Sequence, residues 1–160
     1  MFRSSLFVGA AAIALAFAVA PSVSHAQEWQ ADPTYGSATL ESGFQPDPYQ
    51  FNMTAGGAID ASDTLGGSCR GFVANAPDFN LYFDAGSSLP LAISVAANED
   101  TTLVINGPDG LWYCDDDSGD GLNPSVVFNN PSSGLYNIWV GTYDNEMTPA
   151  TLAVSELSTY

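Results

Sequence analysis

The 160-residue chain is strongly acidic, with 18 Asp and Glu residues against two Lys and Arg residues and one His. Its length corresponds to one domain of ordinary size. A chain so poor in basic side chains has no patch that could follow a phosphate backbone, so nucleic acid is excluded as an electrostatic partner.

The first 26 residues are typical of a secretory signal peptide. Arg3 gives a charged start, the apolar run from Leu6 to Ala20 follows, Pro21 ends that run, and small residues precede a cleavage point after Ala26. The alternative is a membrane anchor, but a spanning helix needs about 20 apolar residues and this run is shorter. We therefore expect cleavage after Ala26, a secreted or periplasmic location, and no membrane contact after cleavage.

Cleavage would remove Arg3 and the only histidine, His25, while all 18 acids would stay. The mature chain would then carry a net charge of −17, with Arg70 as its only basic side chain. Without Lys or His it has no Ser-His-Asp or Cys-His nucleophile and no Schiff-base lysine. We therefore expect no enzyme. The alternative that stays open is a small hydrolase working through a pair of carboxylates, as glycosidases do.

Two cysteines, Cys69 and Cys114, both follow the expected cleavage point. An even pair in an exported protein usually forms a disulfide. Closing a loop of this length stabilises the fold by about 4 kcal/mol in the chain-entropy picture. The alternative, a metal held by two thiolates, would need two further ligands. We expect a Cys69–Cys114 disulfide.

The residues after 26 alternate in the manner of strands and show no capped helical period. Turn residues such as Gly107-Pro108-Asp109-Gly110 separate the apolar runs. The pattern predicts an all-β, jelly-roll-like antiparallel β-sandwich formed by residues 37–160 as one domain, after a flexible leader of residues 27–36. We expect about nine short strands, at 49–54, 71–74, 80–84, 89–95, 101–106, 111–114, 125–128, 135–140 and 150–155.

On strands with a clear alternation of apolar and other residues, every second residue faces the same side of the sheet, and this pattern predicts the core. We expect the core to contain Leu91, Ile93, Val95, Leu103, Ile105, Val126, Phe128, Tyr136, Ile138 and Val140. Asn137 and Trp139 then face away from it. We therefore expect replacement of Asn137 to cost little.

An acidic stretch, Asp115-Asp116-Asp117-Ser118-Gly119-Asp120-Gly121, follows the expected strand 111–114. Crowded carboxylates favour a cation, and calcium takes six to eight oxygen ligands. The frame that starts at Asp116 matches the first half of an EF-hand loop, but its twelfth position is Val127 instead of Glu. We expect a calcium site of another geometry, and the alternative is a solvated acidic turn. The expected ligands are Asp115, Asp116, Asp117 and Asp120, with Asp100 and Asp109 from neighbouring strand ends.

Four aromatic residues, Trp112, Tyr113, Trp139 and Tyr143, lie in the same half of the chain as the acidic stretch. Exposed together, they would form a platform on which a sugar could stack. The alternative is that they pack inside the sandwich. The sequence leaves open which face Trp112 and Trp139 occupy.

Several motifs between residues 78 and 143 point to a known family. They are Asp100–Val104, Gly107–Gly110, the acidic Cys114–Asp117, and Pro131–Val140. This stretch resembles the bacterial pre-peptidase C-terminal domain, in which an Asp-x-x-Leu strand leads to a Gly-x-Tyr-x-Ile/Val-x-Val strand. The resemblance covers about 65 of the 134 residues expected after cleavage.

The resemblance implies a β-sandwich accessory module of secreted peptidases that is non-catalytic and sometimes binds calcium. Here it would stand alone, because the expected mature chain has no room for a catalytic domain. Our hypothesis is a secreted, calcium-stabilised module that binds or accompanies a protein or glycan partner, such as a secreted peptidase. The alternatives are a carbohydrate-binding module that uses exposed aromatic residues, and the small carboxylate-based hydrolase.

Overall fold

The computed structural model describes residues 27–86 and 89–158. The expected signal peptide, residues 1–26, lies outside the described residues. Within the described ranges the chain forms eleven strands and one helical turn. In chain order they are β1 (Gly36–Glu41), β2 (Tyr49–Ala55), β3 (Ile59–Asp60), α1 (Ala61–Thr64), β4 (Phe72–Val73), β5 (Phe79–Asp84), β6 (Leu91–Ala97), β7 (Thr101–Asn106), β8 (Trp112–Asp115), β9 (Ser125–Phe128), β10 (Gly134–Thr142) and β11 (Thr148–Ser155).

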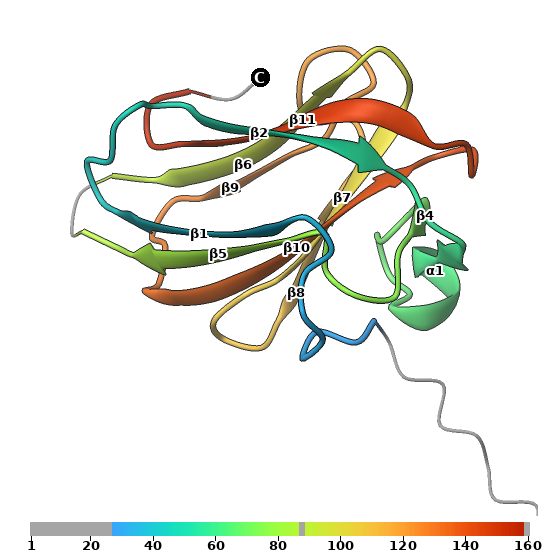
Figure 1. The fold of residues 1–160 in the computed structure, drawn as a ribbon, viewed down its shortest axis with the longest axis horizontal. Helices are drawn as coiled ribbons and strands as arrows, with labels where there is room; N and C mark the ends of the chain where they lie inside the picture. Colours follow the sequence, from blue (N-terminus) through green and yellow to red (C-terminus); the bar gives the residue numbers. More distant parts are fainter. Residues whose placement is uncertain (1–26, 87–88, 159–160) are drawn as a thin grey trace, which may run out of the picture.

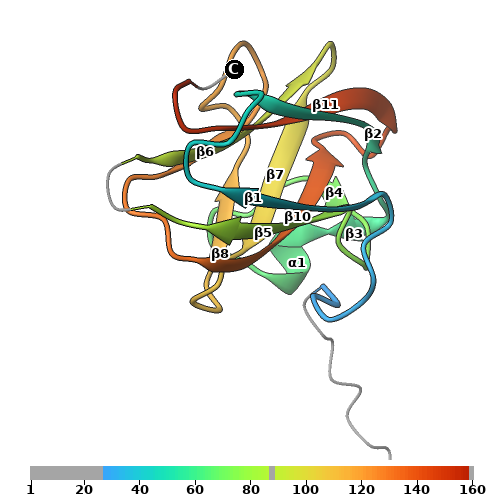
Figure 2. The ribbon, with the colours of Figure 1, turned by 60° about the vertical axis from the view of Figure 1, so that its left-hand side comes forward.

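The strands form two sheets that face each other (Figures 1 and 2). The smaller sheet has four strands in the order β2-β11-β6-β9. The larger has seven strands, with β10 between β5 and β7, β1 outside β5, and β8 outside β7. The predicted antiparallel sandwich is confirmed, with one correction: β1 pairs with β5 in parallel, from Gly36 opposite Phe79 to Glu41 opposite Asp84.

All nine expected strands are present within one to two residues of their expected ends, while β1, β3 and α1 were not expected. β1 was missed because it is an edge strand whose outward residues Ser37, Thr39 and Glu41 are polar and exposed, so it carries little apolar signal. α1 is a single turn capped by Asp60, whose side chain accepts a hydrogen bond from the Ser62 amide at 2.8 Å.

The core between the two sheets contains all ten residues that alternation predicted. Eight of them are buried, and Val126 and Phe128 are partly buried against the others. Phe128 meets Tyr113 and Tyr136 edge-on, with ring centroids 4.8 and 5.2 Å away. The prediction of the core is confirmed because successive side chains of a strand point to opposite faces of the sheet. Residues that face the core therefore recur at every second position.

The outer face of the larger sheet is also covered, next to α1. A second apolar cluster lies there, in which Trp139 of β10 packs with Val104, Val73, Ala61 and Cys69. Trp139 is therefore buried on the outer side of the sheet. Asn137, two positions before Trp139, is only 2% exposed, and this burial argues against the expectation that its replacement costs little.

The disulfide between Cys69 and Cys114 is confirmed and joins the segment after α1 to β8. Arg70, beside it, donates hydrogen bonds to the carbonyl groups of Gly67 and Cys69 at 3.0 and 2.8 Å. Both hydrogen bonds lie within the 67–70 loop, and Cys69 of this loop packs in the cluster around Trp139.

Residues 27–35 run along the segment that precedes β5. The Glu28 amide donates to Asn75 O at 2.9 Å, and the Thr34 amide donates to Pro77 O at 2.8 Å. Gln27 is buried, and Trp29 lies on the outer face of the larger sheet. In the described part of the chain, no helix has the length and apolar character needed to cross a bilayer.

Candidate functional site

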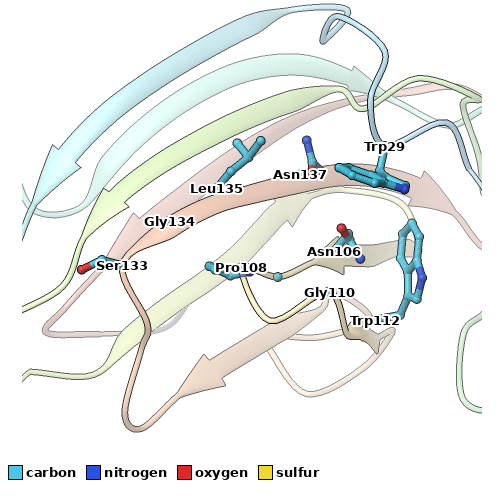
Figure 3. A pocket seen from close by; sticks show the side chains of 10 residues that line it. Trp29, Asn106, Pro108, Gly110, Trp112, Ser133, Gly134, Leu135 and Asn137 are labelled. Atoms are coloured by element: carbon cyan, nitrogen blue, oxygen red, sulfur yellow. The ribbon is translucent and has the colours of Figure 1, made fainter.

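A groove of about 620 Å³ lies on the outer face of the larger sheet, beside the turn that joins β7 to β8 (Figure 3). We call it the indole groove because two tryptophan side chains line it. Its lining residues are Trp29, Asn106, Gly107, Pro108, Gly110, Trp112, Ser133, Gly134, Leu135 and Asn137.

A row of asparagine side chains forms the floor. Asn80, Asn137 and Asn106 are register partners on the adjacent strands β5, β10 and β7, and Trp112 on β8 continues the row. Asn137 donates to Asn80 Oδ1 at 2.8 Å, and Asn106 donates to Leu111 O at 3.4 Å. The row therefore presents amide groups, each able to donate and accept hydrogen bonds, in a place sheltered from water.

Two indole rings stand beside this row. Trp29 is 47% exposed and lies above Asn137, while Trp112 stands beside Asn106 (Figure 3). Trp112 is partly buried and packs on Trp139, with ring centroids 5.3 Å apart. Trp112 is therefore backed by the second apolar cluster, whereas Trp29 offers its surface to solvent.

The β7–β8 turn closes the groove on one side. Gly134, at a φ of 145°, allows this approach, because a Cβ atom there would lie 2.7 Å from Pro108 Cβ. Asp109 organises the turn by accepting hydrogen bonds from the Tyr113 hydroxyl at 2.5 Å and the Leu111 amide at 3.0 Å. These bonds, the one from Tyr113 most of all, lower the pKa of Asp109.

The other expected carboxylates lie at the opposite end of the β7–β8 hairpin. Asp115 ends β8 and shapes the following loop, since its side chain accepts hydrogen bonds from the amides of Ser118 and Ser125 at 2.9 and 2.8 Å. Asn123 ties the loop to β7 by accepting from the Thr101 hydroxyl at 2.7 Å. Asp109 is thus separated by the length of β7 from the rest of the expected metal ligands.

Asp100 lies at this acidic end, where one of its carboxylate oxygens is buried without a hydrogen-bond partner in the described part of the chain. Burial raises the pKa of Asp100, and the charges of Asp117, Asp116 and Asp144 raise it further. The structure therefore brings Asp100 near two expected ligands and adds Asp144, which was not expected. Within residues 27–86 and 89–158, no three His, Cys, Asp or Glu side chains are grouped closely enough to hold a metal ion.

Two titratable groups with strongly raised pKa values lie inside the protein, away from the groove lining. Burial raises the pKa of Asp78 to about 7, against the effect of a hydrogen bond from the Val140 amide. Burial also raises the pKa of Tyr136 to about 12, and its hydroxyl donates to Ser132 O at 2.8 Å. Neither group lines the indole groove, whose ten lining residues carry no ionisable side chain.

The four aromatic residues considered from the sequence do not form one platform. Trp112 lines the groove, Trp139 is buried, and Tyr113 packs on Phe128. Tyr143 is 52% exposed at the acidic end, where its amide donates to Asp100 O at 3.1 Å.

Sequence reasoning missed Trp29 and the asparagine row. Trp29 was passed over because it falls in the segment expected to be a flexible leader. The asparagines become neighbours only through the register of β5, β10 and β7. The available signal was the occurrence of Asn80, Asn106 and Asn137 within strands, where asparagine is disfavoured.

No family model matches the chain, and no curated protein matches it. Among solved structures, it is similar to PliG, a periplasmic inhibitor of g-type lysozyme from Aeromonas hydrophila, at 16% identity and a TM-score of 0.42, covering 78% of this chain and 98% of that one. It is also similar to the pre-peptidase C-terminal domain of collagenase from Bacillus anthracis, at 16% identity and a TM-score of 0.47, covering 78% of this chain and 99% of that one. The collagenase domain is of the type that the sequence motifs resemble.

Proposed function

We propose that this chain is a secreted or periplasmic, non-catalytic module that binds a partner through the indole groove. The groove carries the proposal, because it combines two tryptophan rings with a row of sheltered amides. Binding sites commonly pair apolar and aromatic walls with a few well-placed polar groups. The lining holds no ionisable side chain that could act as a general acid or base on a bound molecule.

The disulfide and the signal-peptide pattern support a secreted or periplasmic location. A Cys69–Cys114 bond forms and persists in an oxidising compartment. The pre-peptidase C-terminal motifs support an accessory role, with a protein such as a secreted peptidase, or a glycan, as the partner.

The three tryptophan indole N–H signals in an NMR spectrum provide the test. The protein is titrated with a panel of neutral oligosaccharides, acidic oligosaccharides, proline-rich peptides and lysine-rich peptides, and each mixture is analysed for cleavage products. We expect at least one class to shift the Trp29 and Trp112 signals, which are assigned with Trp29→Phe and Trp112→Phe, and to be recovered intact. Cleavage of a panel member would overturn the non-catalytic assignment. A panel that leaves both signals in place would overturn the groove as the binding site.

A second proposal concerns calcium at the acidic end, and one observation favours it. Among the described residues no donor reaches the buried oxygen of Asp100, and the charges of Asp117, Asp116 and Asp144 act on this carboxyl group. A calcium ion bound by Asp100 would place a positive charge beside the unpaired oxygen and reduce the repulsion among these carboxylates, provided that the Asp115–Asp120 loop moves its carboxylates closer to Asp100 than the structure has them. A millimolar affinity for calcium is sufficient for a calcium-binding module that works outside the cell. A hundredfold excess over Kd would add about 2.7 kcal/mol to the folded state.

Melting temperatures in calcium and in chelator test this proposal, with sodium chloride used to match ionic strength. We expect calcium to raise Tm by several degrees and the double variant Asp116→Asn, Asp120→Asn to lose most of that rise. The matched control is Glu41→Gln with Asp63→Asn, which removes the same charge from exposed positions elsewhere and should keep the rise. An equal rise with sodium alone would mean that the loop is a solvated turn.

A further inference from the structure

We infer that the ligand of the indole groove is a neutral glycan, with a pyranose ring against Trp29 and hydroxyl groups on Asn106 and Asn137. This inference rests on the proposed function, since it names the ligand class of that binding module.

The charge of the groove favours an uncharged ligand. Its ten lining residues carry no ionisable side chain. The carboxylates just outside are already engaged, Asp109 with Tyr113 and Asp84 with the Ser133 hydroxyl at 3.1 Å. These carboxylates and the net charge of the chain would repel an anion, while a cation would find no carboxylate in the lining.

The polar groups of the groove match sugar hydroxyls. An amide side chain offers a carbonyl acceptor and N–H donors close together, and two adjacent hydroxyls on a sugar ring offer the complementary pair. The Asn137 amide is held in place by its hydrogen bond to Asn80 Oδ1 at 2.8 Å. Because Asn106 and Asn137 are 7% and 2% exposed, hydrogen bonds made there compete little with water.

The tryptophan side chains of the groove match the apolar faces of a sugar ring. A pyranose presents C–H groups on its faces and hydroxyls around its edge, so it can lie flat on an indole while its edge reaches the amides. Trp29 is exposed enough to accept a ring, and Trp112 stands at the same end of the groove (Figure 3). The groove volume, about 620 Å³, falls in the range of sites for small ligands and fits a short stretch of a longer glycan.

A peptide fits this groove less well. Extended peptides usually bind by adding a strand to a free sheet edge, where main-chain groups are unpaired. The asparagine floor of the indole groove lies on β10 and β7, which both have neighbours on both sides, and within the lining only Trp112 comes from the edge strand β8. A peptide main chain laid over it would find side-chain amides only.

The experiment is a binding titration with neutral hexasaccharides (cello-, chito-, malto- and mannohexaose) and the anionic hexagalacturonate, followed by tryptophan fluorescence and calorimetry. We expect at least one neutral hexasaccharide to bind and hexagalacturonate not to bind. Trp29→Ala should weaken binding by about tenfold or more, through loss of the stacked ring face. Tyr143→Ala removes an equally exposed aromatic side chain at the acidic end and should leave binding unchanged.

A second variant, Asn106→Leu, tests the hydroxyl contacts. It keeps both rings and should abolish detectable binding, with folding checked by circular dichroism and Tm. Trp29 is exposed, so its replacement leaves the core untouched and the result stays interpretable if Asn106→Leu unfolds.

Three outcomes overturn the inference. If no neutral hexasaccharide binds while a peptide shifts the Trp29 and Trp112 signals, the glycan assignment fails and the binding-module function stands. If a hexasaccharide binds equally well to wild type and Trp29→Ala, the placement in the groove fails. If no ligand of any class moves either indole signal, the inference and the proposed function fail together.

Discussion

Asp78 is a carboxyl group enclosed by the protein immediately before β5. It is 2% exposed, and its Oδ2 accepts a hydrogen bond from the Val140 amide at 2.8 Å. Its own amide donates to Ile138 O at 2.8 Å, so the residue extends the pairing of β5 with β10. Burial disfavours the charged form and raises the pKa of Asp78 to about 7. Asp78 is thus a structural residue whose charge opposes folding near neutral pH.

This raised pKa makes the stability of the wild-type fold depend on pH, and the direction of the change can be stated. A folded-state pKa above the unfolded value means that the folded state binds the proton more tightly, so the stability from this group is complete below about pH 4 and is lost as pH rises to about 7. Asp78→Asn keeps an acceptor for Val140 and cannot ionise. We expect it to be more stable than wild type at pH 8, with the difference disappearing toward pH 4. Urea denaturation at several pH values measures this, and a constant difference between the two proteins would contradict it.

At the scale of the element, β10 is a strand with two occupied faces. Ile138 points into the main core, whereas Asn137 and Trp139 point to the outer face, where the indole groove and the second apolar cluster cover them. β10 therefore carries residues of the main core on one face and, on the other, residues that line the indole groove or pack in the second apolar cluster.

Substitutions on the two faces should therefore both be costly. We expect Ile138→Ala to lower the free energy of unfolding by about 2–5 kcal/mol through the cavity it leaves. Asn137→Ala should cost about 1–3 kcal/mol, because it leaves Asn80 without its buried donor. Thr39→Ala, on the exposed face of the edge strand β1, is the control and should stay within about 0.5 kcal/mol. An Asn137→Ala cost as small as that of Thr39→Ala would contradict the buried assignment.

The difference between the two faces explains what could be predicted from the sequence. Alternation along β6, β7 and β10 identifies the inner residues because one large core sets that period. The outer face of β10 is covered by irregular segments, the 67–70 loop and residues 27–35, which have no period to recognise. The alternating pattern therefore left the exposure of Trp139 open and suggested that Asn137 could be replaced at little cost, although both residues are buried.

At the scale of the whole molecule, one disulfide joins two parts of a chain with a single expected cleavage site for trypsin. Arg70 is exposed and lies between Cys69 and Cys114 in the sequence. We expect the exported protein to begin at Gln27 by mass, to contain no free thiol, and to give fragments 27–70 and 71–160 that stay joined until a reductant is added. Mass spectrometry before and after reduction measures all three. Fragments that separate without reductant would contradict the disulfide, and a mass that retains residues 1–26 would contradict the signal peptide.

The two candidate sites, the acidic loop and the indole groove, differ in how much of each could be predicted from local sequence. The acidic residues of the Asp115–Asp120 loop are contiguous, so their crowding is visible in the sequence. Antiparallel pairing of β7 with β8 places Asp100 at the same end of the hairpin as this loop, and Asp109 at the opposite end. The indole groove is assembled from three separate segments: the one that carries Trp29, the stretch 106–112 that links β7 to β8, and the stretch 133–137 at the start of β10. Such a site depends on register and on the path of the first described residues, and neither follows from local patterns.

The position of Trp29 has a consequence for how this domain can be attached to other molecules. Trp29 lies two residues after Gln27, so after the expected cleavage anything joined to Gln27 would emerge beside the groove and compete for space with the proposed ligand. The other end of the described chain follows β11, which belongs to the opposite sheet (Figure 1). A carrier protein, a surface or a fluorescent label attached there leaves the indole groove facing outward, so the fold is suited to being displayed from its carboxyl end.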